Sequence, residues 1–184
     1  MKVKNMGSDP VAENVNELWD IYDIDRKVTG RFHRRGDELK PGEYRLVVHV
    51  CIFNNNNQLL IQKRQSNKSM FPGMWDLSAG GSALVGENSR LAIMRESKEE
   101  LGIDIDLNNK MPRFTINFDD GFDDYFMINK DINIEDITIQ EEELSKVKWV
   151  SKEDLIKMRN EGLMIPYFFL DQIFELKDTM GFGI

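Results

Sequence analysis

A fixed arrangement of glycines and charged residues over positions 80–103 constrains this chain more than any other feature. The segment reads GGSALVGENSRLAIMRESKEELGI. The adjacent glycines predict a loop, because glycine adopts backbone conformations that other residues avoid. The stretch from Asn88 to Leu101 predicts a helix, which Gly102 is suited to end. We therefore expect a glycine loop that leads directly into a short, charged helix.

Glutamates of this helix are expected to gather on one face. At about 100° per residue, Glu96, Glu99 and Glu100 fall at positions i, i+3 and i+4. Crowded carboxylates repel one another, and a hard divalent cation relieves that repulsion. Oxygen ligands without a nearby His or Cys favour Mg2+, or Mn2+, over Zn2+. The opposite face is expected to pack against the protein, and it carries Leu91, Met94 and Leu101.

The charges of the helix alone favour a simpler interpretation. Glutamates interspersed with Arg95 and Lys98 are typical of a solvated helix face, and Arg95 could simply pair with Glu99 at i to i+4. The surrounding pattern argues against that interpretation, because fixed gaps separate Gly81, Glu87, the pairs RE and EE, and the closing GI. Over 23 residues, from 81 to 103, a chance match is much less expected than for a short glycine motif.

This pattern resembles the Nudix box, the signature of the Nudix hydrolase superfamily. The resemblance implies a loop-helix-loop that binds Mg2+ and a reaction at a diphosphate. The implied metal ligands are Glu96, Glu99, Glu100, the carbonyl oxygen of Gly80 and, from outside the box, Glu143, with Glu141 and Glu142 as competitors for the last place. One position departs from the family pattern: Ser97 stands where an aliphatic residue is usual. It is expected to lie to the side of the packed face, which concerns packing rather than ligation.

The resemblance also implies catalytic roles. Glu96 or Glu99 would act as the general base, and Arg95 would orient the carboxylates, with Glu87 and Gly81 supporting the cluster from behind. Lys63 and Arg64 end a predicted strand near the expected substrate and could contact its diphosphate. Since neighbouring side chains of a strand point to opposite faces, at most one of these two points inward.

The order of predicted elements favours an α+β fold, an α/β/α sandwich with a mixed sheet between helices. Strands are expected at 44–53, 58–64, 75–78, 113–118, 125–129 and 147–150, and the first two form a hairpin around the asparagine run 54–57. The segment 13–22 reads as a modest N-terminal element, and 26–43 as short strands or loop. Ser151 can cap a helix that runs to Met158, and Pro166 is expected to start a last helix over 167–176.

Length and composition predict one domain. We expect residues 1–25 to be a partly disordered N-terminal extension and residues 26–184 to form a single Nudix domain with a C-terminal helix. With 32 acidic and 24 basic residues, the net charge of −8 opposes binding to nucleic acid. The single Cys51 excludes an intramolecular disulfide, and no stretch suits a signal peptide or a membrane span, so a cytoplasmic protein is expected. The apolar stretch 167–174 should pack on its own sheet, with a homodimer contact as the alternative.

Other conspicuous residues are not expected to belong to the site. His49, alone on a predicted strand, is expected to be structural. The acidic stretch 119–124 is equally well explained as a solvated hairpin turn. The three tryptophans are expected in the core or at its rim rather than as a base-stacking platform, because no basic patch lies between them; they are Trp19, Trp75 and Trp149.

Sequence outside the box points to one branch of the family. The stretches LWDIYDIDRKVTGRFHRRGD, LLIQKR and FPGMWDLSAGG resemble Nudix proteins related to isopentenyl-diphosphate isomerase. Such isomerases carry a Cys-Gly-His run after the tryptophan strand, whereas this chain has Gly80, Gly81 and Ser82. We therefore expect Mg2+-dependent hydrolysis of a diphosphate linkage in a nucleoside diphosphate derivative or similar small organic diphosphate. The alternatives are an isomerase and a non-catalytic ligand-binding domain, whose usual sign, a missing box carboxylate, is not seen.

Overall fold

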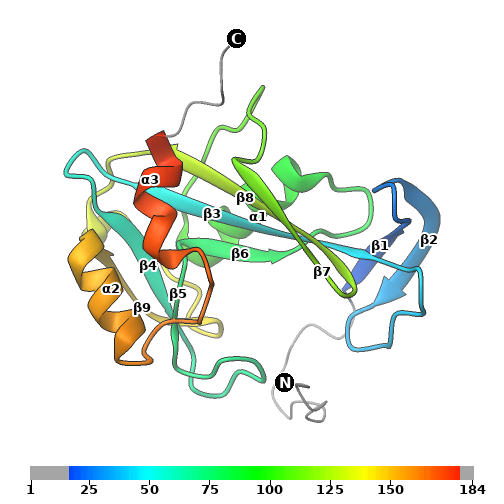
Figure 1. Ribbon diagram of the computed structural model, residues 1–184, viewed down its shortest axis with the longest axis horizontal. Helices are drawn as coiled ribbons and strands as arrows, with labels where there is room; N and C mark the ends of the chain where they lie inside the picture. The colour runs from blue at the N-terminus through cyan, green and yellow to red at the C-terminus, as the bar shows by residue number, and fades with distance from the viewer. Residues whose placement is uncertain (1–16, 179–184) are drawn as a thin grey trace.

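The computed structural model describes residues 17–178, which form two sheets flanked by short helices (Figure 1). A two-stranded sheet pairs β1 with β2, and a seven-stranded sheet carries the order β5-β4-β3-β8-β7, with β6 on β3 and β9 on β4. The strands are β1 (Leu18–Tyr22), β2 (Val28–Arg34), β3 (Arg45–Phe53), β4 (Leu59–Arg64), β5 (Trp75–Asp76), β6 (Ala79–Ser82), β7 (Phe114–Phe118), β8 (Gly121–Asn129) and β9 (Leu144–Val150). The helices are α1 (Ser89–Leu101), α2 (Lys152–Asn160), α3 (Ile173–Asp178) and the 3-10 turns η1 (Ile134–Asp136) and η2 (Leu170–Gln172).

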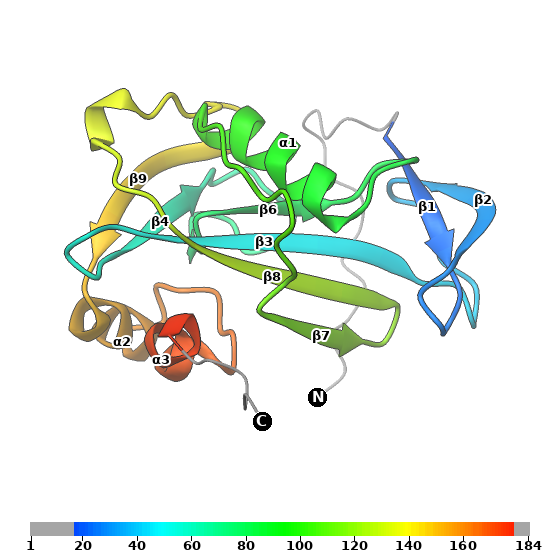
Figure 2. The same cartoon turned by 90° about the horizontal axis from the view of Figure 1, so that it is seen from above.

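The main sheet is mixed and lies between helices. β3 and β8 run parallel over their whole length, while the other strand pairs of this sheet are antiparallel. Helix α1 covers one face and helices α2 and α3 cover the other (Figure 2). The predicted α/β/α sandwich with a mixed sheet is therefore confirmed.

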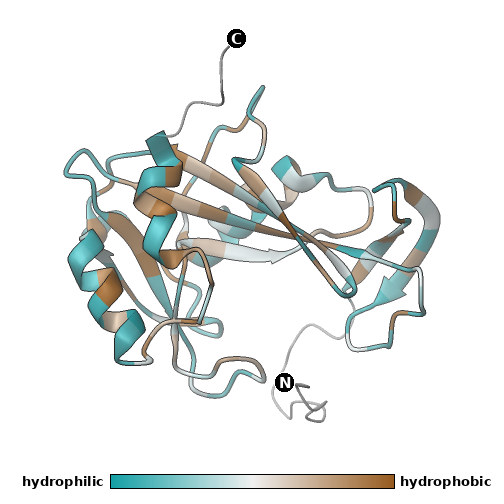
Figure 3. Cartoon of the chain, viewed as in Figure 1, coloured by the Kyte–Doolittle hydropathy of each residue, from teal (hydrophilic) through white to brown (hydrophobic). Residues whose placement is uncertain are grey.

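Two apolar clusters, one on each face of the sheet, hold these layers together. Alternate residues of β3 divide between them, because successive side chains of a strand point to opposite faces. Val48, Val50 and Ile52 pack with Ala92 and Ile93 of α1. The second cluster, beneath α2 and α3, contains Cys51, Phe53, Leu155, Ile173 and Phe174. Apolar residues accordingly follow the strands, and polar ones cover the outer sides of the helices (Figure 3).

The sheet divides between β3 and β4, and this division shapes the molecule. These two strands pair only at Phe53 and Leu59, beside the asparagine turn, where Asn57 has a φ of 57°. Ser78 bridges the gap, since its hydroxyl group accepts a hydrogen bond from the Ile52 N–H (2.9 Å) and donates one to the Leu60 carbonyl (2.6 Å). One half of the sheet thus contains β3, β6, β7 and β8, and the other contains β4, β5 and β9.

Helix ends follow local sequence signals. Asn88 caps α1 by accepting hydrogen bonds from two backbone N–H groups, and Gly102 ends it with a φ of 69°. At α2, Ser151 and Asp154 form a reciprocal capping box. Both helices begin where the sequence predicted them to begin, at Asn88 and after Ser151.

Several expectations need correction. The last helix begins at Ile173, because Tyr167 and the residues after it follow an irregular path before the turn η2. The strand expected over 75–78 is only Trp75–Asp76. The acidic stretch 119–124 is not wholly a solvated turn, because Asp123 and Asp124 lie buried in β8.

The N-terminal segment is a strand where it is described. β1 pairs antiparallel with β2, and the pairing crosses the predicted boundary between residues 25 and 26. The short strands or loop expected over 26–43 are confirmed by β2. The predicted disorder of the first residues falls on 1–16, outside the described residues. The division of the chain at residue 25 stays a prediction.

Candidate active site

A cleft of about 840 Å³ opens beside the glycine loop and the glutamate face of α1. Gly80 and Gly81 of β6 lie on one side with Glu96, Glu99 and Glu100. Other walls come from β1, from the start of β3, from the loop after β4 and from the turn before β9; they contribute Trp19, Arg45, Arg64, Lys68 and Glu143. The cleft therefore brings carboxylates and cationic side chains together from elements far apart in the sequence.

Two of the helix glutamates are withdrawn from water. Glu100 is 6% exposed, and it accepts a hydrogen bond from the Gly80 N–H (3.2 Å) but forms no ion pair with another residue of the described chain. Burial, and then the charge of Glu96, raises the pKa of Glu100 well above its usual value. Burial likewise raises the pKa of Glu96 to about 7, with Arg95 opposing the shift and Glu99 adding to it. Negative charge is thus costly here, and a cation in the cleft would relieve that cost.

Arg95 organises the more exposed side of the cluster. Its guanidinium group donates two hydrogen bonds to Glu87 (2.8 and 3.0 Å), one to Glu99 (2.9 Å) and one to the carbonyl oxygen of Ser82 (3.1 Å), and it lies 3.0 Å from Glu96. Burial opposes ionisation of Glu87, but the hydrogen bonds from Arg95 and from the Leu84 N–H prevail and lower the pKa of Glu87. Arg95 therefore holds the helix against the glycine loop as well as pairing with Glu99.

The two glycines are required by close packing from both faces of β6. A Cβ atom on Gly81 would lie 2.2 Å from a carboxylate oxygen of Glu96. A Cβ atom on Gly80 would lie 2.3 Å from the ring of His49, which faces Gly80 across the β3–β6 pair. Both distances are too short for any real contact, so each glycine leaves room for one particular side chain.

The packed face of α1 differs from the expected one. Its buried residues are Ala92, Ile93, Ser97, Glu100 and Leu101. Leu101 is therefore placed as predicted and Met94 is partly buried, but Leu91 is exposed. The buried face follows the spacing i, i+4 and i+8 from Ile93 through Ser97 to Leu101, and Leu91 falls on the other side of the helix.

The predicted site residues are gathered in part. Arg64 lines the cleft and donates from its Nε to the Met70 carbonyl oxygen (3.0 Å), whereas Lys63 is not among the cleft residues. Glu143 and Glu142 both line the cleft, and Glu143 forms an ion pair with Lys68 (2.7 Å). Glu87 lies behind the cluster, in contact with Arg95.

Among the cleft residues that sequence reasoning missed are Trp19, Arg45 and Lys68. Arg45 lies over the rings of Trp19 and Phe118 (5.7 and 5.3 Å) and near Asp120 (3.5 Å). Nothing local marks these side chains. The place of Lys68 depends on the loop after β4, and the places of Trp19 and Arg45 depend on how β1 packs beside the glycine loop. That packing is fixed by hydrogen bonds from the Val85 N–H to the Leu18 carbonyl (2.9 Å) and from the Gly86 N–H to Asp20 (2.7 Å).

Comparison with known proteins decides the family. The NUDIX domain model matches residues 43–168, which is more than half of the chain. The chain belongs to the Nudix hydrolase family. Such enzymes act on small molecules and generally use divalent metal ions.

Relatives and solved structures agree with this assignment. An uncharacterised Nudix hydrolase of Listeria innocua is 55% identical over 163 residues, covering 89% of this chain and 96% of that one. An isopentenyl-diphosphate isomerase of Salmonella heidelberg is 37% identical, over 52% of this chain and 53% of that one. A crystal structure of a Deinococcus radiodurans protein shares the fold, with a TM-score of 0.70 and 22% identity, over 89% of this chain and all of that one. The resemblance to the isomerase-like branch is thus confirmed.

The departure of this Nudix box from the family pattern has a structural explanation. Ser97 is fully buried, and its hydroxyl group donates to the Ile103 carbonyl oxygen (3.1 Å). The expectation that Ser97 lies to the side of the packed face is therefore wrong. The hydroxyl group compensates for burial by bonding the chain just after the helix end.

The carboxylates of this Nudix site do not yet converge as ligands. Within residues 17–178, no group of three or more His, Cys, Asp or Glu side chains is arranged to hold a metal ion. The donor chemistry nevertheless fits Mg2+, because the cleft offers carboxylate oxygens and backbone carbonyls without His or Cys. Glu96 and Glu99 are engaged by Arg95, so ligation requires their side chains to turn.

No helix within residues 17–178 is long and apolar enough to cross a membrane.

Proposed function

We propose that the protein hydrolyses a diphosphate linkage in a nucleoside diphosphate derivative or a similar small organic diphosphate, with Mg2+ as its cofactor. The observation that carries this proposal is the pair of withdrawn carboxylates, Glu96 and Glu100, beside the Gly80 backbone in a cleft that also contains Arg64 and Lys68. The two carboxylates are suited to bind a divalent cation, and the cationic side chains of Arg64 and Lys68 are suited to bind phosphate oxygens. One cleft thus supports both parts of a metal diphosphate complex.

Specific residues would hold the metal ion. Glu96, Glu99 and Glu100 would contribute carboxylate oxygens, Gly80 its carbonyl oxygen and Glu143 a further carboxylate. When bound, Mg2+ supplies positive charge that stabilises a phosphate under attack and makes a bound water more acidic. Mn2+ is the expected substitute, because it prefers similar oxygen ligands.

The remaining steps fall to side chains of this chain. Glu96 or Glu99 would accept the proton of the attacking water, and Arg95 would keep both carboxylates on the cleft side of α1. Arg64 reaches the cleft from β4 and would neutralise a phosphate oxygen with its planar guanidinium group. Lys63 does not line the cleft, and at most one of Lys63 and Arg64 was expected to; Lys68 is a further cation that lines it and would contact another phosphate oxygen.

The geometry favours hydrolysis over isomerisation. The positions where the isomerases carry Cys and His are occupied by Gly80 and Ser82. The packing of His49 leaves no room for a side chain at Gly80. Cys51 is fully buried on the face of β3 that points away from α1, and burial raises its pKa. A binding domain without turnover is disfavoured because no box carboxylate is missing, and Glu96, Glu99 and Glu100 all line the cleft.

The test is a substrate panel with purified protein and Mg2+. The panel contains nucleotide sugars, dinucleotides, nucleoside triphosphates, thiamine-type diphosphates and isopentenyl diphosphate, and phosphate release and double-bond migration are followed separately. We expect release from at least one compound and its loss in EDTA. Migration without release would establish the isomerase instead, and tight binding without either would establish the binding domain.

A variant connects the activity to the site. Glu99→Gln should lower turnover by orders of magnitude and leave the fold intact, because the amide keeps the shape of the side chain but loses its charge. Glu153→Gln is the matched control, since Glu153 is an exposed glutamate on α2, on the other side of the sheet. Unchanged turnover in Glu99→Gln would exclude the assigned metal site.

A further inference from the structure

A chain of buried polar groups lies beneath the cleft, on the face of the sheet opposite α1. His49 Nδ1 lies 2.8 Å from Asp123, and Asp123 also accepts a hydrogen bond from the Tyr125 hydroxyl group (2.6 Å). On the other side of the His49 ring, Nε2 lies 3.3 Å from the Tyr167 hydroxyl oxygen, and that hydroxyl group donates to Asp76 (2.8 Å). The polar atoms of these five residues contribute to neither apolar cluster, and none of the five residues takes part in the proposed chemistry.

The protons of this chain can be assigned by counting donors. Burial, and then the charge of Asp76, raises the pKa of Tyr167 well above its usual value, so its phenol stays protonated and donates its one proton to Asp76. At the 3.3 Å contact the Tyr167 oxygen therefore accepts from Nε2, and because His49 also donates from Nδ1 to Asp123, this arrangement requires a proton on both nitrogens of the His49 ring. Both oxygens of Asp123 accept, one from Tyr125 and one from His49 Nδ1. The Tyr167 hydroxyl group is thus bonded on both sides.

This hydroxyl group joins the two halves of the divided sheet. His49 belongs to β3, and its ring packs against the Gly80 backbone. Asp76 belongs to β5 and lies 3.9 Å from the guanidinium group of Arg64. β3 and β4 pair only at their hairpin end. Ser78 bridges the gap among apolar residues, and Tyr167 bridges it at the end beside the cleft.

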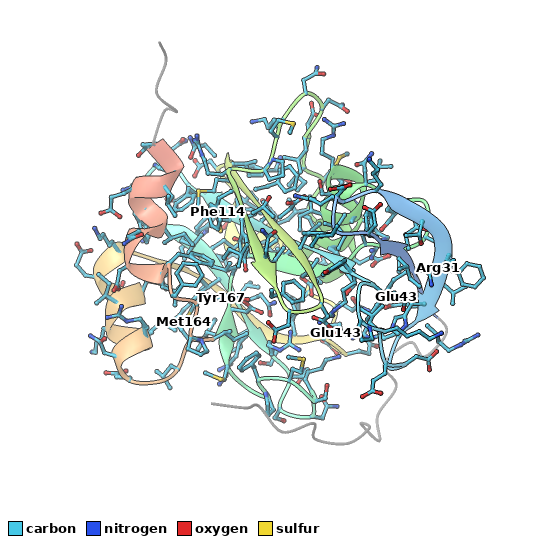
Figure 4. The ribbon with its side chains drawn as sticks, turned by 45° about the vertical axis from the view of Figure 1, so that its right-hand side comes forward. Arg31, Glu43, Phe114, Glu143, Met164 and Tyr167 are labelled. Atoms are coloured by element: carbon cyan, nitrogen blue, oxygen red, sulfur yellow. The ribbon has the colours of Figure 1, made fainter. Side chains whose placement is uncertain are left out.

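The link originates in the C-terminal segment, outside any regular element. Tyr167 lies on the side of this segment that faces the sheet (Figure 4). Its ring is held edge-on to His49 and Tyr125 and against Phe169. The Ile165 N–H donates to the Trp75 carbonyl oxygen (2.9 Å), so the backbone just before Tyr167 is tied to β5. The hydroxyl group therefore has a fixed position from which to act on both halves.

We propose that Tyr167 is a positioning residue for the reaction: its hydroxyl group fixes the Gly80 backbone, through His49, relative to Arg64, through Asp76. This inference rests on the proposed function, because it assigns Gly80 to the metal side of the cleft and Arg64 to the phosphate side. The distance between those two groups must match the distance between metal ion and phosphate in the substrate complex, and misplacement of such groups is costly in rate. Tyr167 controls that distance without touching the substrate.

The experiment compares Tyr167→Phe with Tyr125→Phe. Both variants keep an aromatic ring and remove one buried hydroxyl group from the same polar chain, but only the first breaks the link between the sheet halves. Binding of Mn2+ alone, without substrate, is measured from the electron paramagnetic resonance signal of the free ion. We expect Tyr167→Phe to weaken Mn2+ binding roughly 10-fold, as is typical when a group that supports metal ligands is removed. Tyr125→Phe should bind Mn2+ nearly as wild type does.

A second measurement tests the connection to Arg64. The kcat/KM of the best substrate in the panel is measured for Tyr167→Phe, Arg64→Ala and the double variant. If Tyr167 acts through Arg64, the two losses are not additive, whereas the losses from Tyr125→Phe and Arg64→Ala should be additive. Equal effects of the two tyrosine variants, or additive losses for Tyr167→Phe, would show a merely structural role and overturn the inference.

Further outcomes separate this inference from the proposed function. If wild type neither binds Mn2+ nor releases phosphate, the proposed function itself fails. If wild type does both and Tyr167→Phe matches it, only the positioning role fails. Should Tyr167→Phe not fold, His49→Gln removes the ring from beneath Gly80 and is expected to weaken Mn2+ binding to the same extent; wild-type binding in that variant would overturn the inference.

Discussion

The backbone N–H of Gly80 donates a hydrogen bond to the buried carboxylate of Glu100 (3.2 Å), and this bond joins the glycine loop to the helix that follows it. Among residues 17–178 it is the one hydrogen bond to the Glu100 carboxylate, whose other charged neighbours are acids. Burial and these acids raise the pKa of Glu100, so a carboxyl group at this position lowers the stability of the fold at neutral pH. Such a cost is typical of sites that are completed by a ligand.

Replacing this carboxylate should separate stability from activity. In EDTA, Glu100→Gln should raise the free energy of unfolding by on the order of 1 kcal/mol or more, because a neutral amide removes the cost of burying an ionisable carboxyl group beside Glu96 and keeps an acceptor for the Gly80 N–H. The same variant should lose most of its Mg2+-dependent turnover. Urea unfolding in EDTA and the activity assay check the two effects, and a variant less stable than wild type in EDTA would contradict the prediction.

Gly81→Ala should remove the function by a steric route. The added Cβ atom would lie 2.2 Å from the Glu96 carboxylate, so that side chain must leave its place above the glycine loop. We expect a large rise in the Mg2+ concentration needed for half-maximal activity. Gly30→Ala is the comparison: Gly30 has a φ of 77° and open space around it, so alanine there should cost about 1 kcal/mol of stability without changing the Mg2+ requirement.

Arg95→Lys tests the role of the planar guanidinium group. Lysine keeps the charge but cannot bond Glu87 twice and also reach Glu99 and the Ser82 carbonyl oxygen. We expect turnover to fall roughly 10- to 100-fold, as when groups that orient metal ligands are changed. Arg90→Lys, on the same helix and outside the cleft residues, should behave as wild type. Full activity in Arg95→Lys would mean that Arg95 contributes charge alone.

The site within the box was largely predictable because its residues are close in sequence. Glycine loop, helix start, helix end and shared glutamate face follow from local rules, and Asn88, Gly102, Glu96 and Glu100 are placed accordingly. Leu91 and Ser97 were misplaced because the face that packs is rotated relative to the expected one, so that it includes Ser97 and Glu100 and leaves Leu91 on the other side. Which face of a helix meets the sheet is a tertiary property, and apolar residue types alone did not identify it here.

Residues that meet only through the fold were not predictable. Trp19 and Arg45 line the cleft because β1 packs beside the glycine loop, and Lys68 does so through the loop after β4. The role of His49 as a structural residue stays a prediction, and its partners Asp123 and Tyr167 come from β8 and from an irregular C-terminal segment. No spacing in the sequence indicates such meetings, and the start of α3 was misplaced for the same reason.

Cys51 should be unreactive in the folded protein. It is fully buried, and burial together with nearby Asp76 raises the pKa of its thiol, so little thiolate is available at neutral pH. The native protein should react with a thiol-specific disulfide reagent only as fast as it unfolds, and completely in denaturant. Cys51→Ser should keep the activity that the panel identifies. Rapid reaction of the native thiol would reopen the isomerase alternative.

Glu87 should contribute stability that depends on pH. Its pKa is lower in the folded protein than in the unfolded chain, because its hydrogen bonds with Arg95 and the Leu84 N–H outweigh the effect of burial. The contribution is therefore fully present above the unfolded pKa of about 4.3 and is lost as pH falls through the folded value. Glu87→Gln should cost roughly 1–2 kcal/mol at pH 7 and show a smaller loss of stability than wild type on acidification. The measurement is urea unfolding at several pH values between 7 and 3, and Glu153→Gln should leave the wild-type profile unchanged. Parallel profiles for wild type and Glu87→Gln would contradict the prediction, because they would show that ionisation of Glu87 is not linked to folding.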